Sequence, residues 1–234
     1  MRLSLETREV GRVTIVRCNG RIVSGDESES LRAHVAWLLR DRRAIVLHLG
    51  EVGFVDSSGL GTMVRTLTSV RQKGGDLKLC NVPEHTRKVL KMTNLTKLFD
   101  THESEEGAVS AFYRAQSRVE QPAHTGLSIL CVDRSGDVLA YLRELLRRAG
   151  HDVHTSSSLA DSLMLMRVTS FRLLLLGPGL TASPAVQQTF QQACAKVPVL
   201  QLGHEFSGLE AGEAASGLLE KIAASLNSSS GSPC

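Results

Sequence analysis

One stretch of the sequence, FVDSSGLGTMV at residues 54–64, joins an apolar run directly to a helical pattern. The run before it, AIVLHLG at residues 44–50, has the length and composition of a buried strand. After it, four apolar residues are spaced at i, i+3, i+4 and i+7, so we expect a helix that begins at or just after Ser57. These residues are Leu60, Met63, Val64 and Leu67. A strand that turns sharply into a helix is typical of α/β folds.

The alternation of strand-like and helix-like runs continues through the chain and is interrupted once. Residues 117–126 (SRVEQPAHTG) lose the apolar periodicity and contain a proline and a glycine, which predicts a linker between two domains. In the first half we expect strands at 13–23, 44–50 and 76–82, and helices at 24–40, 57–73, 84–92 and 105–116. In the second half we expect strands at 127–132, 151–156, 171–177 and 197–202, and helices at 135–150, 158–168 and 184–196.

Two local patterns refine this expectation. Ser24 and Glu27 have the spacing of a capping box, so we expect them to cap the helix that follows. In the second half the strands are almost uniformly apolar, which predicts a parallel sheet covered on both faces. The fold class is therefore α/β in both halves.

Composition excludes several classes of function. Aromatic residues make up only 4% of the chain, and 18 basic residues against 14 acidic ones in residues 1–116 form too weak an excess for nucleic-acid binding. The mild excess suits an acidic protein surface instead. No apolar run approaches the roughly 20 residues that span a bilayer. The five cysteines are scattered without a C-x-x-C pair, so we expect no metal site, no cofactor, no membrane and a cytoplasmic protein.

The Asp-Ser-Ser-Gly turn at residues 56–59 has three interpretations. In the first, the polar residues only cap the helix, since Ser and Asp are preferred there. In the second, a serine is a hydrolase nucleophile, but the G-x-S-x-G elbow is absent around both Ser57 and Ser58. In the third, a serine is a phosphorylation switch. A phosphate at a helix N-terminus is tolerated by its own domain, yet it adds about −1.5 to −2 charges to the surface.

The stretch GFVDSSGLGTMVRTLTSVRQKGGDLKLCNV resembles the STAS domain of bacterial anti-sigma factor antagonists. The similarity extends over nearly all of residues 1–116, through CNGRIVSGDESESLR, AIVLHLGEVGFVDSSGLG and VLKMTNLTKLFD. It implies a mixed sheet with helices. It also implies that Ser57 is the regulatory serine, and that the partner-binding residues are the turn itself. These residues are Asp56, Ser57, Ser58, Gly59 and Leu60.

The family resemblance also implies the partners. Ser57 is expected to be phosphorylated by an anti-sigma factor of the histidine-kinase-like ATPase class, which is a serine kinase, and to be reset by a serine phosphatase. Unphosphorylated protein binds the partner and frees a sigma factor, whereas phosphorylated protein releases it. Asp56 is expected to shape the turn, Gly59 to permit close approach, and Ser58 to cap the helix.

Residues 127–226 resemble a response-regulator receiver domain in layout, with a flavodoxin-like parallel sheet, but lack its chemistry. The acid Asp133 follows the first strand, and Arg134 stands where a second acid is commonly found. Gly177 stands at the end of the third strand, where the phosphoryl-accepting aspartate of the family belongs, and glycine has no side chain to modify. The interpretation is therefore a pseudo-receiver, with Asp133 and Asp137 in turn and cap roles.

These expectations combine into one domain plan. It comprises a STAS domain at 1–116, a linker at 117–126, a pseudo-receiver at 127–226 and a disordered tail at 227–234. The function expected is non-enzymatic: an anti-sigma factor antagonist that is switched at Ser57. One alternative is a STAS scaffold in which the receiver-like domain mediates homodimer formation or docking. Another is a residual phosphoryl-accepting enzyme built on Asp133.

Overall fold

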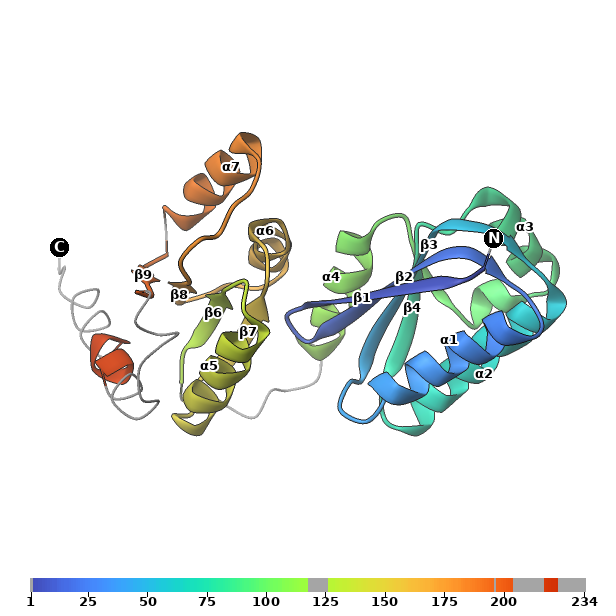
Figure 1. Cartoon of the computed structure of the whole chain (residues 1–234), viewed down its shortest axis with the longest axis horizontal. Coiled ribbons are helices and arrows are strands. Elements are labelled where there is room, and N and C mark those ends of the chain that lie inside the picture. The colour runs from blue at the N-terminus through green and yellow to red at the C-terminus, as the bar shows by residue number, and fades with distance from the viewer. Residues whose placement is uncertain (1, 118–125, 196, 204–216, 223–234) are drawn as a thin grey trace. The chain divides into compact units, whose positions relative to one another are not determined.

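The computed structural model describes residues 2–117, 126–195, 197–203 and 217–222 (Figure 1). The chain divides into two compact units, Met1–Glu120 and Gln121–Cys234. Most of the predicted linker at 117–126 and all of the predicted tail at 227–234 lie outside the described residues. We describe each unit by itself.

The first unit contains a mixed sheet in which the strands lie in the order β5-β4-β3-β2-β1. Strand β1 runs antiparallel to β2, whereas β2, β3, β4 and β5 are parallel to one another. The expectation of a mixed sheet with helices is therefore confirmed. The strands are β1 (Ser4–Val10), β2 (Val13–Ile22), β3 (Ala44–Val55), β4 (Asp76–Cys80) and β5 (Asp100–His102).

Helices cover both faces of this sheet. Helices α1 and α2 lie side by side across one face, and α4 lies on the other (Figure 1). Their bounds are α1 (Asp26–Leu38), α2 (Ser57–Gln72), α3 (Glu84–Met92) and α4 (Glu105–Ser117), with a short 3-10 helix η1 (Leu95–Lys97) after α3. The start of α2 at Ser57 is as the apolar spacing predicts.

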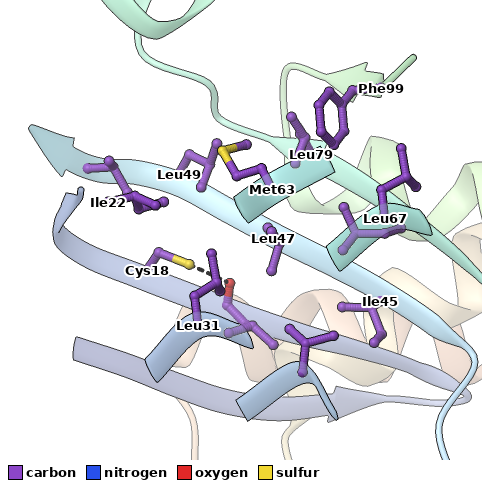
Figure 2. Packing of buried hydrophobic residues seen from close by; sticks show 14 of the residues in the cluster. Cys18, Ile22, Leu31, Ile45, Leu47, Leu49, Met63, Leu67, Leu79 and Phe99 are labelled. Carbon is purple, nitrogen blue, oxygen red and sulfur yellow. Dashed lines mark hydrogen bonds between the residues drawn. The ribbon is translucent and has the colours of Figure 1, made fainter. Parts of the chain in front are cut away.

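The core of the first unit is aliphatic, as the scarcity of aromatic residues requires. Figure 2 shows Leu31 of α1 and Met63 and Leu67 of α2 packed against the central strands. Strand β3 contributes Ile45, Leu47 and Leu49. These side chains are fully buried, and at about 25 cal/mol per Å² of apolar surface their burial is the main stabilising term for the unit.

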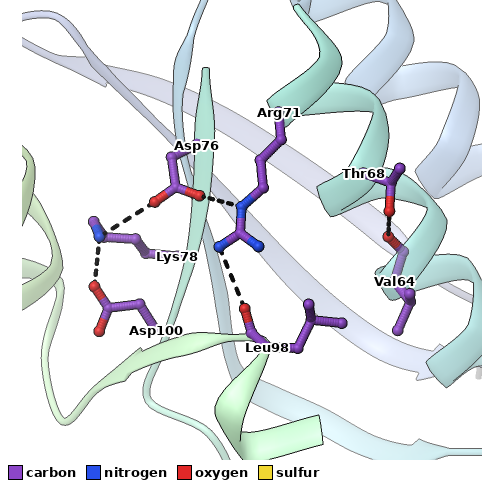
Figure 3. Close-up of polar contacts among 7 residues, drawn as sticks. All are labelled: Val64, Thr68, Arg71, Asp76, Lys78, Leu98 and Asp100. Carbon is purple, nitrogen blue, oxygen red and sulfur yellow. Dashed lines mark hydrogen bonds and ion pairs between the residues drawn. The ribbon is translucent and has the colours of Figure 1, made fainter. Parts of the chain in front are cut away.

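A polar network closes the side of the sheet at β4 and β5 (Figure 3). The buried ammonium of Lys78 lies 3.5 Å from Asp76 and 2.5 Å from Asp100. Arg71 at the end of α2 pairs with Asp76 at 3.1 Å and donates to the carbonyl oxygen of Leu98 at 3.3 Å. The network thus joins the end of α2 to both strands.

In the first unit, sequence analysis missed two strands and misjudged the cap of α1. The apolar residues of β1 are interrupted by charges, and β5 has only three residues, so neither has a clear strand pattern. The capping box at Ser24 and Glu27 is wrong, because α1 begins at Asp26 after Gly25 and has no side-chain cap. The φ of Gly25 is 96°, a left-handed conformation that favours glycine.

The second unit contains a parallel sheet in the order β7-β6-β8-β9. Its strands alternate with helices, so the expected α/β alternation is present. The elements are β6 (Ser128–Val132), α5 (Gly136–Arg148), β7 (Asp152–Ser156), α6 (Leu159–Val168), β8 (Leu173–Leu176), α7 (Pro184–Cys194) and β9 (Val199–Gln201). Its aliphatic core is centred on Ile129, Leu142 and Leu175.

Candidate functional site

The turn between β3 and α2 is organised by one aspartate. Asp56 is the N-cap of α2, with φ −90° and ψ 179°, and its Oδ1 accepts the N–H of Gly59 at 2.7 Å. Its carbonyl oxygen accepts the N–H of Leu60 at 2.9 Å. The bond to Leu60 is the first intrahelical bond of α2, and the Asp56 side chain satisfies the otherwise free N–H of Gly59. The expectation that Ser58 is the cap is wrong, because Ser57 and Ser58 are the first two residues of the helix itself.

The same aspartate ties the turn to the loop between β2 and α1. Its Oδ2 accepts the N–H of Ser24 at 3.2 Å, and its own N–H donates to the carbonyl oxygen of Ile22 at 3.3 Å. Sequence analysis missed this role of Ser24, and no local spacing signals it, because 32 residues separate the two partners. The loop before α1 is thus held next to the serine turn.

Asp56 is in its charged form at neutral pH. The backbone N–H of Gly59 lowers the pKa of this carboxyl most strongly; desolvation opposes this by raising the pKa, and the N–H groups of Ser24 and Ser58 lower it further. The charge is also suited to its place, since an acidic group at a helix N-terminus interacts favourably with the helix dipole.

Gly59 permits the close approach that the sequence predicts. A Cβ at this position would lie 2.0 Å from the carbonyl oxygen of Ile22 and 2.7 Å from its carbon. These are backbone atoms, which cannot move aside as a flexible side chain can. Glycine is therefore required at position 59 for α2 to start against the end of β2.

Burial divides the five residues of the turn into two groups. Ser57 and Ser58 are exposed and Asp56 is half-buried, whereas Gly59 is buried and Leu60, 6% exposed, belongs to the core. Within the described part of the chain, neither serine hydroxyl is hydrogen-bonded to another residue. Among the described residues, no side chain is therefore hydrogen-bonded to either hydroxyl as an activating base would be, and both serines are exposed to solvent.

An exposed aromatic residue stands beside the turn. Phe54, near the end of β3, is 51% exposed and pairs in register with the exposed Arg21 on β2. Sequence analysis missed this residue, because an apolar residue at the end of a strand pattern reads as core. Its position adds apolar surface to the region around the two serines.

The second unit has a related but closed arrangement at the ends of its strands. Asp133 follows β6, is only 7% exposed, and accepts the N–H of Ser135 at 2.7 Å through Oδ1. A Cβ at Gly177, which follows β8, would lie 1.7 Å from Asp133 Oδ2. The Asp133 carboxylate therefore fills the place where a side chain at position 177 would begin.

The turn role expected of Asp133 is confirmed by this contact with Ser135, whereas the cap of α5 is Ser135 rather than Asp137. Arg134 is exposed. Among the described residues, no group of three or more His, Cys, Asp or Glu side chains is placed to hold a metal ion. Within the same residues, no helix is long and apolar enough to cross a membrane.

Comparison with known proteins shows which family the sequence of the first unit matches. The STAS domain model matches residues 4–108. The chain is 30% identical over 105 residues to BtrV of Bordetella bronchiseptica, named as an anti-sigma factor antagonist, a match that covers 44% of this chain and 90% of that one. It is 30% identical over 112 residues to the anti-sigma F factor antagonist of Paenibacillus polymyxa, covering 47% of this chain and 95% of the relative.

Among solved structures, the chain is similar to that of an anti-sigma factor antagonist from Thermotoga maritima. It is 24% identical, with a TM-score of 0.42, over 50% of this chain and 95% of the other.

Proposed function

Because this chain belongs, through residues 4–108, to the STAS family of anti-sigma factor antagonists, we propose that it binds an anti-sigma factor through the β3–α2 turn and is released by phosphorylation of Ser57. The partner proposed is an anti-sigma factor of the histidine-kinase-like ATPase class, which acts as the serine kinase. A separate serine phosphatase restores the binding form. The chain is then a regulator and a substrate, as STAS antagonists generally are, rather than an enzyme.

The observation that carries this proposal is that capping of α2 and exposure of a hydroxyl fall to different residues of the turn. Asp56 caps α2, so the serines are not needed for that purpose and their hydroxyls stay exposed. Gly59 and Leu60 are buried and fix the backbone of the turn. Asp56, Ser57 and Ser58 are at least partly exposed and are available for contact with a partner. A turn built in this way can change its surface charge without losing its fold.

The chemical step is a phosphoryl transfer from ATP held by the partner. The Oγ of Ser57 forms a bond to the γ-phosphorus, ADP leaves with the electrons of the broken P–O bond, and the hydroxyl proton passes to a base of the kinase. Hydrolysis by the phosphatase returns the hydroxyl and releases inorganic phosphate. The serine itself needs no base from this chain.

The phosphate is expected to act on the partner rather than on the domain. It adds about −1.5 to −2 charges at the N-terminus of α2, where N–H groups and the helix dipole tolerate an anion. It also stands beside the charged Asp56 and near the exposed Phe54. A partner that covers this surface must desolvate the dianion without a matching charge, which disfavours the complex.

We further propose that residues 1–116 form the STAS domain and that 127–226 form a flavodoxin-like pseudo-receiver. The strand order β7-β6-β8-β9 supports the second assignment, since it corresponds to the flavodoxin-like order 2-1-3-4. The Asp133 carboxylate over Gly177 supports a unit that does not accept a phosphoryl group. Its role in this proposal is protein contact.

The test is affinity capture from the source organism with the full chain and two matched pairs of variants. These are Ser57→Ala with Ser57→Glu and, as the control, Ser58→Ala with Ser58→Glu. The proposal requires that an ATPase of the stated class is retained by the wild type and Ser57→Ala, and is lost with Ser57→Glu. Retention by Ser57→Glu with loss by Ser58→Glu would move the switch to Ser58. Identical partners for all variants would favour the scaffold.

A further inference from the structure

The outward face of α3 combines positive charge with an exposed methionine. Lys88, Lys91 and Met92 are spaced at i, i+3 and i+4, so they lie on one face of the helix. The opposite face, with Thr86 and Leu90, is buried. Met92 is 84% exposed, more than any other large apolar side chain in the part of the chain that the structure describes.

The lysines of this face have no carboxylate partner in the unit. Lys88, Lys91 and Lys97 make no ion pair with any described residue, although Arg87 on the same helix pairs with Glu103 at 2.7 Å. Lys97 belongs to η1, which packs directly against α3, and it is exposed like the other two. We call Lys88, Lys91, Met92 and Lys97 the α3 surface.

Local helix physics explains only part of this arrangement. Lys91 lies in the last turn of α3, where a positive charge interacts favourably with the helix dipole. The helix dipole does not account for the exposure of Met92, and Lys97 lies beyond the helix. An exposed apolar side chain on the same helix face as lysines that make no ion pair with described residues has the composition of a small binding surface for an acidic segment.

We propose that the α3 surface is a docking site for an acidic protein segment that carries one apolar side chain among its carboxylates. The carboxylates pair with the three lysines, and the apolar side chain packs on Met92, whose flexible thioether adapts to different shapes. An anionic membrane fits less well, because stable insertion needs a broad apolar face and the apolar residues Val89 and Leu90 pack toward the core.

The α3 surface and the β3–α2 turn share no residue, so the segment proposed here pairs with side chains other than those of the turn. The segment proposed here is recognised by the positive charge of the α3 surface, whereas a phosphate at Ser57 would add negative charge at the turn.

The test uses the full chain and two labelled peptides. One peptide consists of glutamates around a central leucine, and in the other a serine replaces the leucine. Binding is measured by fluorescence anisotropy, and the site is mapped by amide chemical shifts. The first variants are the charge reversal Lys88→Glu/Lys91→Glu and the truncation Met92→Ala. All three positions are exposed, so each variant is expected to fold; Lys91→Glu also reverses a favourable charge at the end of α3, so circular dichroism should show a small drop in the thermal midpoint of the charge-reversal variant.

The control pair is Arg40→Glu and Trp37→Ala. Like the α3 surface, this region has an exposed basic residue, Arg40, close in sequence to an exposed large apolar side chain. Trp37, on α1, is 58% exposed. They therefore test whether any charge with any exposed apolar residue suffices.

We expect the charge reversal to weaken binding of the leucine peptide by about tenfold or more, since two charge pairs of about 0.7 kcal/mol each correspond to one decade. Met92→Ala should weaken the leucine peptide by several-fold and leave the serine peptide unchanged. Equal effects from the control pair, or shifts that map away from residues 88–97, would overturn the proposal. Binding to phosphatidylserine vesicles that is lost in the same variants, with no peptide binding, would replace it with a membrane contact.

Discussion

Both units have an aspartate and a glycine at the ends of parallel strands and use them in opposite ways. In the first unit, Asp56 points along the turn to cap α2, and Gly59 lets the backbone of the helix approach Ile22. In the second unit, Asp133 folds inward over Gly177, and the glycine makes room for the carboxylate itself. The first turn leaves two hydroxyls in solvent, whereas the second buries its polar group.

The difference shows how similar residue types lead to an open or a closed turn. An aspartate that caps a helix removes the need for a serine to do so, and this leaves the serine exposed for another role. In the second unit, the Asp133 carboxylate occupies the space that a side chain at position 177 would need, so no reactive side chain fits there. The predictions below test this comparison, beginning with the largest effect.

The largest effect is expected for Gly59→Ala. The added methyl would lie 2.0 Å from a backbone oxygen that cannot move without shifting β2, so we expect a loss of about 3 kcal/mol in the free energy of unfolding. Hydrogen–deuterium exchange in peptides from β3 and α2 reports on this unit separately. The matched control is Gly61→Ala in the same helix, where the methyl meets only the guanidinium of Arg65 at 3.3 Å. This control should be neutral or stabilising, by up to about 1 kcal/mol, and equal losses at both glycines would contradict the account.

A smaller effect is expected for Gly177→Ala. Here the methyl meets a side-chain oxygen, and Asp133 can move away if it gives up its bond to the N–H of Ser135. We expect a loss of about 2 kcal/mol, measured by hydrogen exchange in peptides from β6 and β8.

A double-mutant cycle with Asp133→Ala identifies the cause of that loss. If the Asp133 carboxylate is the obstacle, Gly177→Ala costs less in the Asp133→Ala background, with a coupling of about 1 kcal/mol or more. Purely additive losses would show that the two residues do not compete for the same space.

The smallest effect is expected at the cap of α2. Asp56→Ala removes both acceptors and should lower the thermal midpoint, whereas Asp56→Asn keeps one acceptor and should lower it less. Folding lowers the pKa of Asp56, so its stabilisation is present above the pKa of the unfolded chain and is lost as the pH falls through the pKa of the folded state.

The midpoint of Asp56→Asn should therefore approach that of the wild type as the solution is acidified from neutral pH. Glu51→Gln, which removes another exposed carboxylate on β3, is the control, and its midpoint at neutral pH should lie closer to that of the wild type than the midpoint of Asp56→Asn does. A constant gap between Asp56→Asn and the wild type would show that the charge of Asp56 does not support the turn.

Most of the fold could be predicted from the sequence because its signals are local. The apolar spacing after Ser57 and the uniform apolar runs of β6 and β8 gave the right elements. The strands β1 and β5 could not be predicted, because each depends on pairing with a neighbour rather than on its own apolar pattern. Pairing of this kind is a tertiary effect that overrides propensity.

The candidate site was only partly predictable for the same reason. The residues of the turn could be singled out from the sequence, and so could the need for a glycine at position 59. The choice of cap could not, because Asp56 and Ser58 are both good capping residues and the backbone decides between them. The contact of Asp56 with Ser24 and the exposure of Phe54 depend on how β2 and β3 end together.

The most direct test of the switch is to incubate the full chain with ATP and the captured ATPase and to locate the phosphate by mass spectrometry. Wild type, Ser57→Ala and Ser58→Ala are compared, and the fraction of chain bound to the ATPase is followed in the same samples. The account predicts one phosphate on Ser57 in the wild type and in Ser58→Ala, none in Ser57→Ala, and release in step with modification. A phosphate on another residue, or modification without release, would contradict it.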